Sequence, residues 1–184
     1  MKIVKTVLAG LMASALLSSG AMAANNQGSG IILFKGNIVD APCSLVQDSS
    51  EAQTVDMGVL SNSAIRNGNT PVKNFNLRLE GCDLQRYGAD GNASGDKWSG
   101  VKVTFSGPSV GDNNTQYLSA TDNVGIELTQ GGKALTIGSP ADKILIQGGN
   151  QMLPFGAQVK VVDKSKPIPL TNFTATANFT MEYE

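Results

Sequence analysis

The sequence predicts an all-β fold, either a sandwich or a barrel, and three observations support that prediction. Short runs of alternating apolar and polar residues recur along the chain, separated by turns rich in Gly and Asn. Phe173 to Tyr183 alternate for eleven residues without a break. No stretch has the apolar spacing of a convincing helix. Many short strands with closely spaced turn signals are typical of sandwiches and barrels.

The N-terminal segment predicts export. Lys2 and Lys5 form a basic start, residues 7–17 are mostly apolar, and Ala21-Met22-Ala23 places small residues where signal peptidase cleaves. Residues 1–23 are therefore expected to be a signal peptide, and their apolar run is too short for a permanent membrane anchor. Removal leaves 161 of the 184 residues, a length that suits one domain.

Residues 24–36 combine a flexible polar lead with an apolar stretch. Extended-chain geometry divides their side chains between two faces: Gly28, Gly30, Ile32 and Phe34 on one, Ile31 and Leu33 on the other. Most domains fold such a segment into their own sheet. A segment on a loose lead can instead serve another molecule, and the composition alone leaves both interpretations open.

The charge balance excludes two classes of partner. The formal charge is -1 for the whole chain and -3 once Lys2 and Lys5 are removed, and no basic stripe runs along the sequence. We therefore expect neither nucleic-acid binding nor direct insertion or attachment to a membrane through a polybasic patch.

Cys43 and Cys82 are the only cysteines, and both lie in the exported part of the chain. A disulfide between them is expected in an oxidising compartment. A reactive thiol pair is the alternative, but it lacks both the C-x-x-C spacing and a basic environment that would lower a thiol pKa.

The first half of the exported chain reads as strands interrupted by two loops. Residues 36–45 lead through Ala41-Pro42 to Cys43, residues 54–60 follow, and residues 75–82 alternate as a half-buried strand. Between them, residues 62–70 are expected to be a polar loop. Residues 85–100, rich in Gly, Asp and Asn, are expected to be a long exposed loop. Trp98 at its exit is read as a core plug or a rim contact, with ligand binding as the alternative.

The second half continues the strand pattern. Residues 101–105 alternate before Gly107-Pro108, and residues 124–128 and 134–137 flank Gln130-Gly131-Gly132, which is a hairpin signal. Residues 144–147 form a short strand, Gly148-Gly149-Asn150 a turn, and residues 155–162 a further strand.

The C-terminal segment predicts a strand with one buried face. Its odd positions are apolar and its even positions polar. Ala175 and Ala177 are small where a closed core favours Val or Ile. This face therefore either leaves room for side chains from elsewhere or is filled by bulky residues of the facing sheet.

Catalytic chemistry is not expected. The chain has no histidine, so the commonest general base and metal ligand is missing. Asp83, Asp90 and Asp96 are scattered in or beside the 85–100 loop and lack the spacing of a calcium loop. The Gly-rich stretches end strands without opening helices, so they are turns and not phosphate-binding loops. We expect no enzyme activity, no cofactor and no metal.

Several short motifs follow one another along nearly the whole exported chain. They are Gly36-Asn37-Ile38-Val39-Asp40-Ala41-Pro42-Cys43, Val55-Asp56-Met57-Gly58, Phe75-Asn76-Leu77, Gly81-Cys82-Asp83, Val124-Gly125-Ile126-Glu127-Leu128, Phe155-Gly156-Ala157, and the closing alternation with Tyr183. In the order and spacing of these motifs the chain resembles the type 1 and P-type pilin subunits of the chaperone–usher pathway.

The resemblance implies an incomplete immunoglobulin-like sandwich at residues 36–184 that lacks its last strand. A donor-strand extension at residues 24–35 precedes it. The implied function is that of a structural fimbrial subunit, exported through the periplasm to the cell surface. Its implied partners are a periplasmic chaperone, an outer-membrane usher and neighbouring subunits, with the extension of one subunit completing the fold of the next.

The resemblance also assigns roles to residues. The donor face is Gly28, Gly30, Ile32 and Phe34, with Gly30 at a constriction of the groove. The groove edge and chaperone-binding strand is formed by Phe173, Ala175, Ala177, Phe179, Met181 and Tyr183, and the carboxylate of Glu184 is the anchor for basic residues of the chaperone. One departure is Thr171, which stands where the family usually has glycine, fourteen residues from the C-terminus.

Other functions stay open at this point. The chain is short for a two-domain tip adhesin, but a minor adaptor or a terminating subunit of the same fibre fits the same motifs. A self-contained secreted sandwich that binds a ligand near Trp98 is the alternative from the binding class. A hydrolase that uses carboxylates alone is the alternative from the enzyme class.

Overall fold

The computed structural model describes residues 30–46 and 53–184. The predicted signal peptide and Gly28 lie outside these residues. The chain divides into two units between Ile38 and Val39. All the helices and strands found among the described residues belong to the second unit, residues 39–184.

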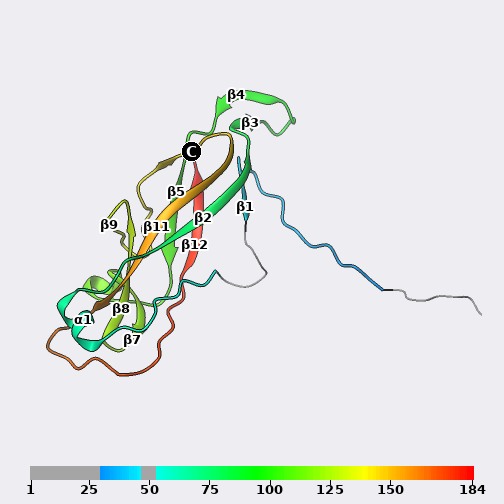
Figure 1. Cartoon of the computed structure of the whole chain (residues 1–184). Helices are drawn as coiled ribbons and strands as arrows, with labels where there is room; N and C mark the ends of the chain where they lie inside the picture. The colour runs from blue at the N-terminus through cyan, green and yellow to red at the C-terminus, as the bar shows by residue number, and fades with distance from the viewer. Residues whose placement is uncertain (1–29, 47–52) are drawn as a thin grey trace, which may run out of the picture. The chain divides into compact units, whose positions relative to one another are not determined.

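The regular secondary structure of the second unit consists almost entirely of antiparallel strands (Figure 1). In chain order they are β1 (Ser44–Val46), β2 (Lys73–Cys82), β3 (Gln85–Tyr87), β4 (Ala93–Lys97), β5 (Gly100–Ser106), β6 (Ser109–Val110), β7 (Tyr117–Thr121), β8 (Val124–Gln130), β9 (Lys133–Ala134), β10 (Ile144–Leu145), β11 (Gly149–Val161) and β12 (Asn178–Tyr183). One sheet has the order β1-β2-β11-β8-β7-β6 with β9 beside β8, and a second has the order β10-β5-β12. The all-β prediction is confirmed.

The core lies between the two sheets. The most deeply buried side chains come from both of them: Leu79, Leu153 and Val159 from the larger sheet, Val101 and Val103 from the smaller one. Phe105 of β5 meets Phe155 of β11 edge to face, with ring centroids 5.0 Å apart. Aromatic pairs in this geometry add to the stability that burial alone provides.

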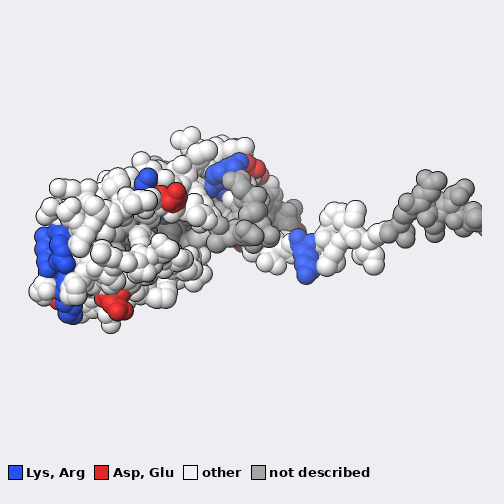
Figure 2. Space-filling model, turned by 60° about the horizontal axis from the view of Figure 1, so that its bottom comes forward, with Lys and Arg blue, Asp and Glu red and all other residues white. Residues whose placement is uncertain are grey.

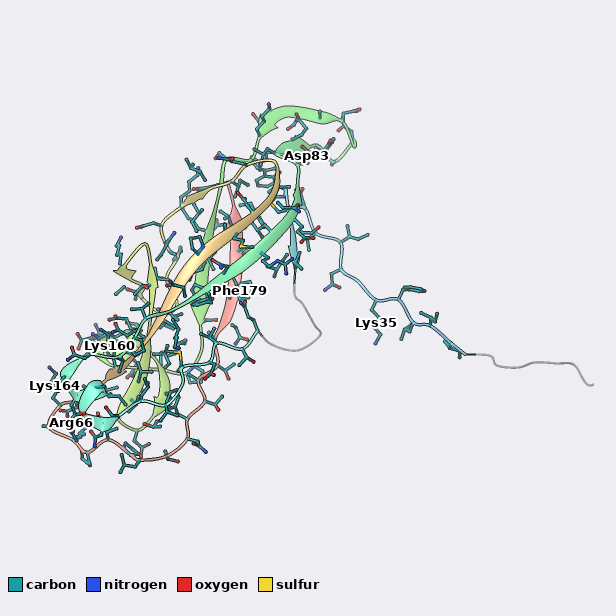
Figure 3. All side chains as sticks on the ribbon, in the orientation of Figure 1. Lys35, Arg66, Asp83, Lys160, Lys164 and Phe179 are labelled. Atoms are coloured by element: carbon teal, nitrogen blue, oxygen red, sulfur yellow. A yellow bond between two sulfur atoms is a disulfide. The ribbon has the colours of Figure 1, made fainter. Side chains whose placement is uncertain are left out.

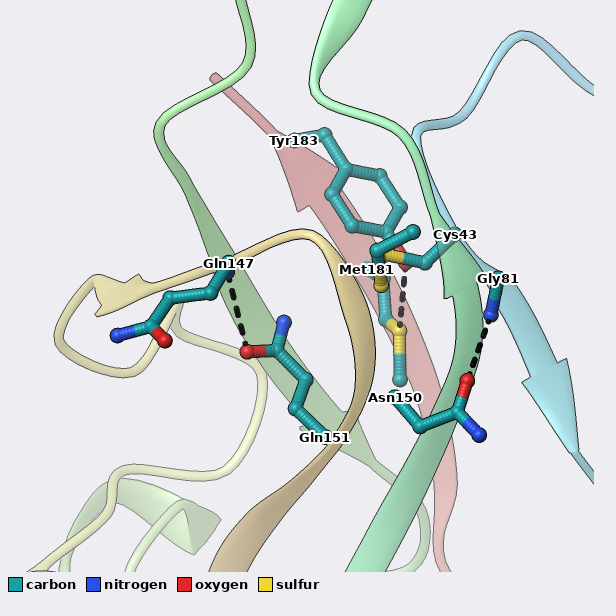
Figure 4. Close-up of a disulfide and its surroundings, with 8 residues drawn as sticks. Cys43, Gly81, Gln147, Asn150, Gln151, Met181 and Tyr183 are labelled. Carbon is teal, nitrogen blue, oxygen red and sulfur yellow. Dashed lines mark hydrogen bonds between the residues drawn. A yellow bond between two sulfur atoms is a disulfide. The ribbon is translucent and has the colours of Figure 1, made fainter.

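A disulfide joins Cys43, just before β1, to Cys82 at the end of β2 (Figure 4). The predicted bridge is therefore confirmed. It closes a loop with a sequence separation of 39 residues. In the chain-entropy model such a loop closure contributes about 4 kcal/mol to folding. The bridge also fixes the start of β1 to the end of β2.

Two predicted loops contain regular structure, and both of those predictions were wrong. Residues 62–70 include helix α1 (Asn62–Asn67), which begins at Ser61, whose hydroxyl accepts a hydrogen bond from the Ala64 amide, and ends at Gly68 with φ 71°. These are ordinary cap signals. The helix has only six residues, so its apolar spacing was too short to reveal it.

Residues 85–100 include the hairpin β3-β4, in which Gln85 is opposite Lys97. Its side chains are mostly exposed, as expected of the composition, but the backbone pairs with itself. Trp98 is 8% exposed and its ring stacks under the guanidinium of Arg86, 4.0 Å from the ring centroid. The interpretation of Trp98 as a core plug is confirmed.

The hairpin predicted around Gly131-Gly132 is present as β8-β9, and both glycines have positive φ, 56° and 82°. Residues 54–60, predicted as a strand, pair with no described strand and are irregular. This difference bears directly on the groove described next.

Candidate binding groove

Strand β12 lies at the edge of its sheet and pairs with β5 alone among the described strands. The register sets Phe179 opposite Phe105 and Tyr183 opposite Val101. Phe179, Met181 and Tyr183 are partly buried against the core, while the residues between them are exposed. The other edge of β12 therefore presents backbone N–H and C=O groups that pair with no described strand. A further strand can bind to such an edge through main-chain hydrogen bonds.

The C-terminal strand is shorter than the eleven-residue alternation predicted. Only Asn178–Tyr183 form a strand, and residues 171–177 pair with no described strand. The partner β5 ends at Ser106, and a Cβ atom at Gly107 would lie 2.5 Å from the carbonyl oxygen of Thr176. The chain at Thr176 therefore passes close to the end of β5, but residues 171–177 keep the pattern of a strand without forming a ladder with any described strand.

A groove with a volume of about 1200 Å³ runs beside this unpaired segment. One wall is residues 53–60 with Ile65 of α1, and the other is residues 168–177 with Phe179. The floor is made of buried apolar side chains from both sheets: Leu77, Phe105, Leu118, Val124, Ile126, Leu128 and Ala157. No described strand lies between the two walls, and the floor below them is apolar.

The predicted groove-edge residues divide into two groups. Phe173, Ala175, Ala177 and Phe179 line the groove, and the space beside the two alanines is open instead of being filled by the facing sheet. Met181 and Tyr183 lie beyond the groove. The ring of Tyr183 packs edge to face against Trp98, with centroids 6.2 Å apart (Figure 4 shows Tyr183 and Met181).

The C-terminal residue is held by its own domain. Amides of Ser99 and Gly100 donate to the Glu184 main-chain oxygen at 2.7 and 3.0 Å. The side-chain carboxylate of Glu184 is 2.9 Å from the ammonium group of Lys102 and 3.4 Å from that of Lys143. The hydrogen bond from Lys102 is the main cause that lowers the pKa of Glu184 below its ordinary value. Loss of hydration opposes this shift, and the charges of Lys102 and Lys143 add to it.

The N-terminal unit presents apolar side chains without regular structure. Its described residues, 30–38, form no strand, and Ile31, Ile32, Leu33 and Phe34 are between 72% and 98% exposed. Gly30, Ile32 and Phe34, predicted as the donor face, are thus described, and Gly28 is not. A run of exposed large apolar side chains marks an interaction segment.

Sequence reasoning missed one wall of the groove. Residues 54–60 were read as a strand and Ile65 as part of a loop, although both line the groove. On the opposite wall, Thr171 was noted only as a departure from the family pattern. Met57 and Leu60 are partly buried against the core. Their spacing in the sequence, however, does not distinguish a groove wall from an ordinary strand.

No metal site or membrane helix occurs in the part of the chain that the structure describes. Residues 30–46 and 53–184 contain no group of three His, Cys, Asp or Glu side chains placed to hold a metal ion. Within the same residues no helix has the length and apolarity needed to cross a membrane. On the face drawn in Figure 2, charged side chains are few and uncharged residues cover most of the surface.

Comparison with known proteins identifies the family. A family model described as "Fimbrial protein" matches residues 32–184. The chain belongs to the fimbrial protein family. Fimbrial relatives include the F7-2 fimbrial protein of Escherichia coli, 32% identical over 98% of this chain and all of the relative, and the major MR/P fimbria protein of Proteus mirabilis, 30% identical over the whole of both chains.

Fimbrial structures match the fold as well. The rod subunit PapA of the P pilus is 28% identical, with a TM-score of 0.65 over 78% of this chain and all of that one. A subunit in a chaperone–usher pilus is 30% identical, with a TM-score of 0.69 over 86% and 97% of the two chains. The prediction of an incomplete immunoglobulin-like pilin sandwich is confirmed, and the chain is a structural subunit of a surface fimbria.

Proposed function

We propose that this fimbrial subunit polymerises by donor-strand exchange, in which residues 24–35 of one copy occupy the groove of the next. The observation that carries the proposal is the groove itself. It has an apolar floor, and residues 171–177 on one wall pair with no described strand. An added strand supplies main-chain hydrogen bonds to such an edge and inserts alternate side chains into the space below.

The N-terminal segment has the properties of the occupant. Ile32 and Phe34 are 78% and 87% exposed, and burying either one stabilises a complex by about 1.5–3 kcal/mol. In the proposed orientation Gly28, Gly30, Ile32 and Phe34 face the floor, and Gly30 passes the narrow part of the groove. Ile31 and Leu33 face outward.

A periplasmic chaperone fills the groove before assembly, and an outer-membrane usher then catalyses the exchange. An empty groove exposes an edge and an apolar floor, which makes the unassembled subunit prone to aggregation. The chaperone binds along Phe173 to Tyr183 with basic residues on the carboxylate of Glu184. Those residues would replace Lys102 and Lys143, which hold the side-chain carboxylate within the free subunit.

A position in the fibre shaft, as opposed to an adaptor or terminator, is favoured by the relatives. One of them is named the Pap fimbrial major pilin protein of Escherichia coli, 32% identical over 98% of this chain. A terminating subunit needs a blocked groove, whereas this groove is open along residues 168–177.

A synthetic peptide of residues 24–35 tests the exchange. Added to the mature chain at 100 times its Kd, it is expected to stabilise the domain by about 2.7 kcal/mol. That corresponds to an increase in Tm of roughly 5–10 °C for a domain of this size. The control peptide carries Ile32→Thr and Phe34→Thr. Equal Tm values with the two peptides would argue against insertion of this segment.

A further inference from the structure

The end of the groove wall is fixed by one buried polar side chain. Asn123, between β7 and β8, is 2% exposed. Its side-chain oxygen accepts a hydrogen bond of 2.8 Å from the Asp163 amide. Its side-chain nitrogen donates to three carbonyl oxygens, those of Asp163, Lys166 and Pro167, at 2.9, 3.2 and 3.1 Å. A buried amide satisfied in this way holds four backbone groups of one loop in place.

A second side chain also binds residues of this loop, residues 163–167. Arg66 of α1 donates from its two terminal nitrogens to the carbonyl oxygens of Lys164 and Lys166, both at 3.2 Å. Its third nitrogen donates to the side chain of Asn62 at 3.0 Å. Arg66 and Lys164 are seen at the same end of the domain in Figure 3, although they are 98 residues apart in the chain.

Helix α1 is itself attached to the larger sheet. The hydroxyl of Thr70, just after the helix, donates to the carbonyl oxygen of Val159 in β11 at 2.7 Å. Thr70 is 5% exposed. Because the hydrogen bond of Thr70 attaches the end of α1 to β11, Arg66 holds the loop at a fixed position relative to the larger sheet.

The loop leads directly into the groove wall. Ile168, the next residue, is 6% exposed and lines the groove together with Ile65 of α1. Residues 169–177 continue the wall to β12. Because residues 171–177 pair with no described strand, the wall depends on its two ends for its position. One end is β12, and the other is the loop held by Asn123 and Arg66.

We infer that Asn123 and Arg66 are positioning residues that pre-order the 168–177 wall for an incoming strand from a second copy of this chain. The inference rests on the proposed strand exchange. A wall that is already ordered loses less conformational entropy when the strand binds, so a larger part of the interaction appears as affinity. If the wall is competent only part of the time, the apparent affinity falls by the same fraction.

Arg66→Ala in the mature chain tests this role, with Lys164→Ala as the matched control. Both substitutions remove one positive charge from the same end of the domain, but Lys164 contributes its main-chain carbonyl and not its side chain to the bond with Arg66. We expect Arg66→Ala to weaken binding of the 24–35 peptide about tenfold. Lys164→Ala is expected to bind the peptide like the wild type.

Hydrogen exchange without peptide separates positioning from a general loss of stability. In Arg66→Ala the amides of residues 163–173 are expected to exchange about tenfold faster, while those of β12 keep the wild-type rate. Asn123→Ala is expected to have the same pattern with a larger effect. Unchanged exchange at residues 163–173 in Arg66→Ala, or equal acceleration in β12, would overturn the inference. Failure of the wild type to bind peptide would contradict the proposed function, whereas the exchange comparison would still decide the role of Arg66.

Discussion

We expect a subunit from which residues 24–35 have been deleted to form no fibre, while its domain still binds a partner strand supplied by another molecule. The deletion removes the proposed donor but leaves the disulfide, both sheets and the groove, which all lie within residues 39–184. Electron microscopy of cells that express the variant, together with co-purification of the periplasmic chaperone, measures both halves of this expectation. Fibres of normal length from the deletion variant would rule out residues 24–35 as the donor.

Point substitutions in the same segment provide a matched control for the deletion. Replacing Ile32 and Phe34 by Thr is expected to prevent assembly, since each lost burial costs about 1.5–3 kcal/mol. Replacing Ile31 and Leu33 by Thr removes a similar apolar area from the outward face and is expected to leave assembly intact. The two variants differ only in the face that they change.

Filling the groove has the second large effect. Ala175 lines the groove and is partly buried, so Ala175→Phe places a ring where the strand must pass. Overpacking of this kind costs about 1–3 kcal/mol, which corresponds to roughly 5- to 150-fold weaker binding of the 24–35 peptide. Fluorescence titration with a labelled peptide measures the change.

Thr180→Phe is the control for the filled groove. Thr180 is exposed on β12 and does not line the groove, so the same ring is added outside it. The control is expected to bind peptide with the affinity of the wild type. If Ala175→Phe bound the peptide as tightly as the wild type, the peptide would have to bind somewhere other than along residues 171–177.

Alternating apolar and polar residues predicted the strands well where each strand has a pairing partner within the same domain. The alternation in residues 75–82 and 101–105 corresponds to β2 and β5, whose partners lie within the same domain. The disulfide was also predictable, because two cysteines in an exported chain have one obvious pairing. In these places short-range sequence and long-range packing agree.

The alternation of residues 171–177 was as clear, yet those residues form no strand. Side-chain periodicity reports which face is buried, whereas a strand also needs a hydrogen-bonded neighbour, and β5 ends too early to provide one. The mismatch between a perfect pattern and an absent ladder marks the groove. Ala175 and Ala177 hinted at the open space, but their spacing did not reveal whether the facing sheet would fill it.

The grip of Asn123 and Arg66 on residues 163–167 could not be predicted from the sequence. These hydrogen bonds join residues that are 40 to 100 positions apart, and their acceptors are main-chain carbonyl groups. Every residue has such a carbonyl group, so the sequence does not reveal which one is the partner. Helix α1 was missed because its six residues are too few to show an apolar period.

Cysteine cross-linking in assembled fibres tests strand exchange most directly. Cysteine is introduced at position 32 and at Ala175 in one chain, with a companion variant carrying it at position 33 and at Ala175. We expect the first variant to form a covalent ladder of subunits under oxidising conditions, since Ile32 faces the groove of the next copy and Leu33 faces outward. A ladder from the position-33 variant alone would reverse the assignment of faces. Absence of intersubunit cross-links from both variants, in fibres that otherwise assemble, would contradict donor-strand exchange through this groove.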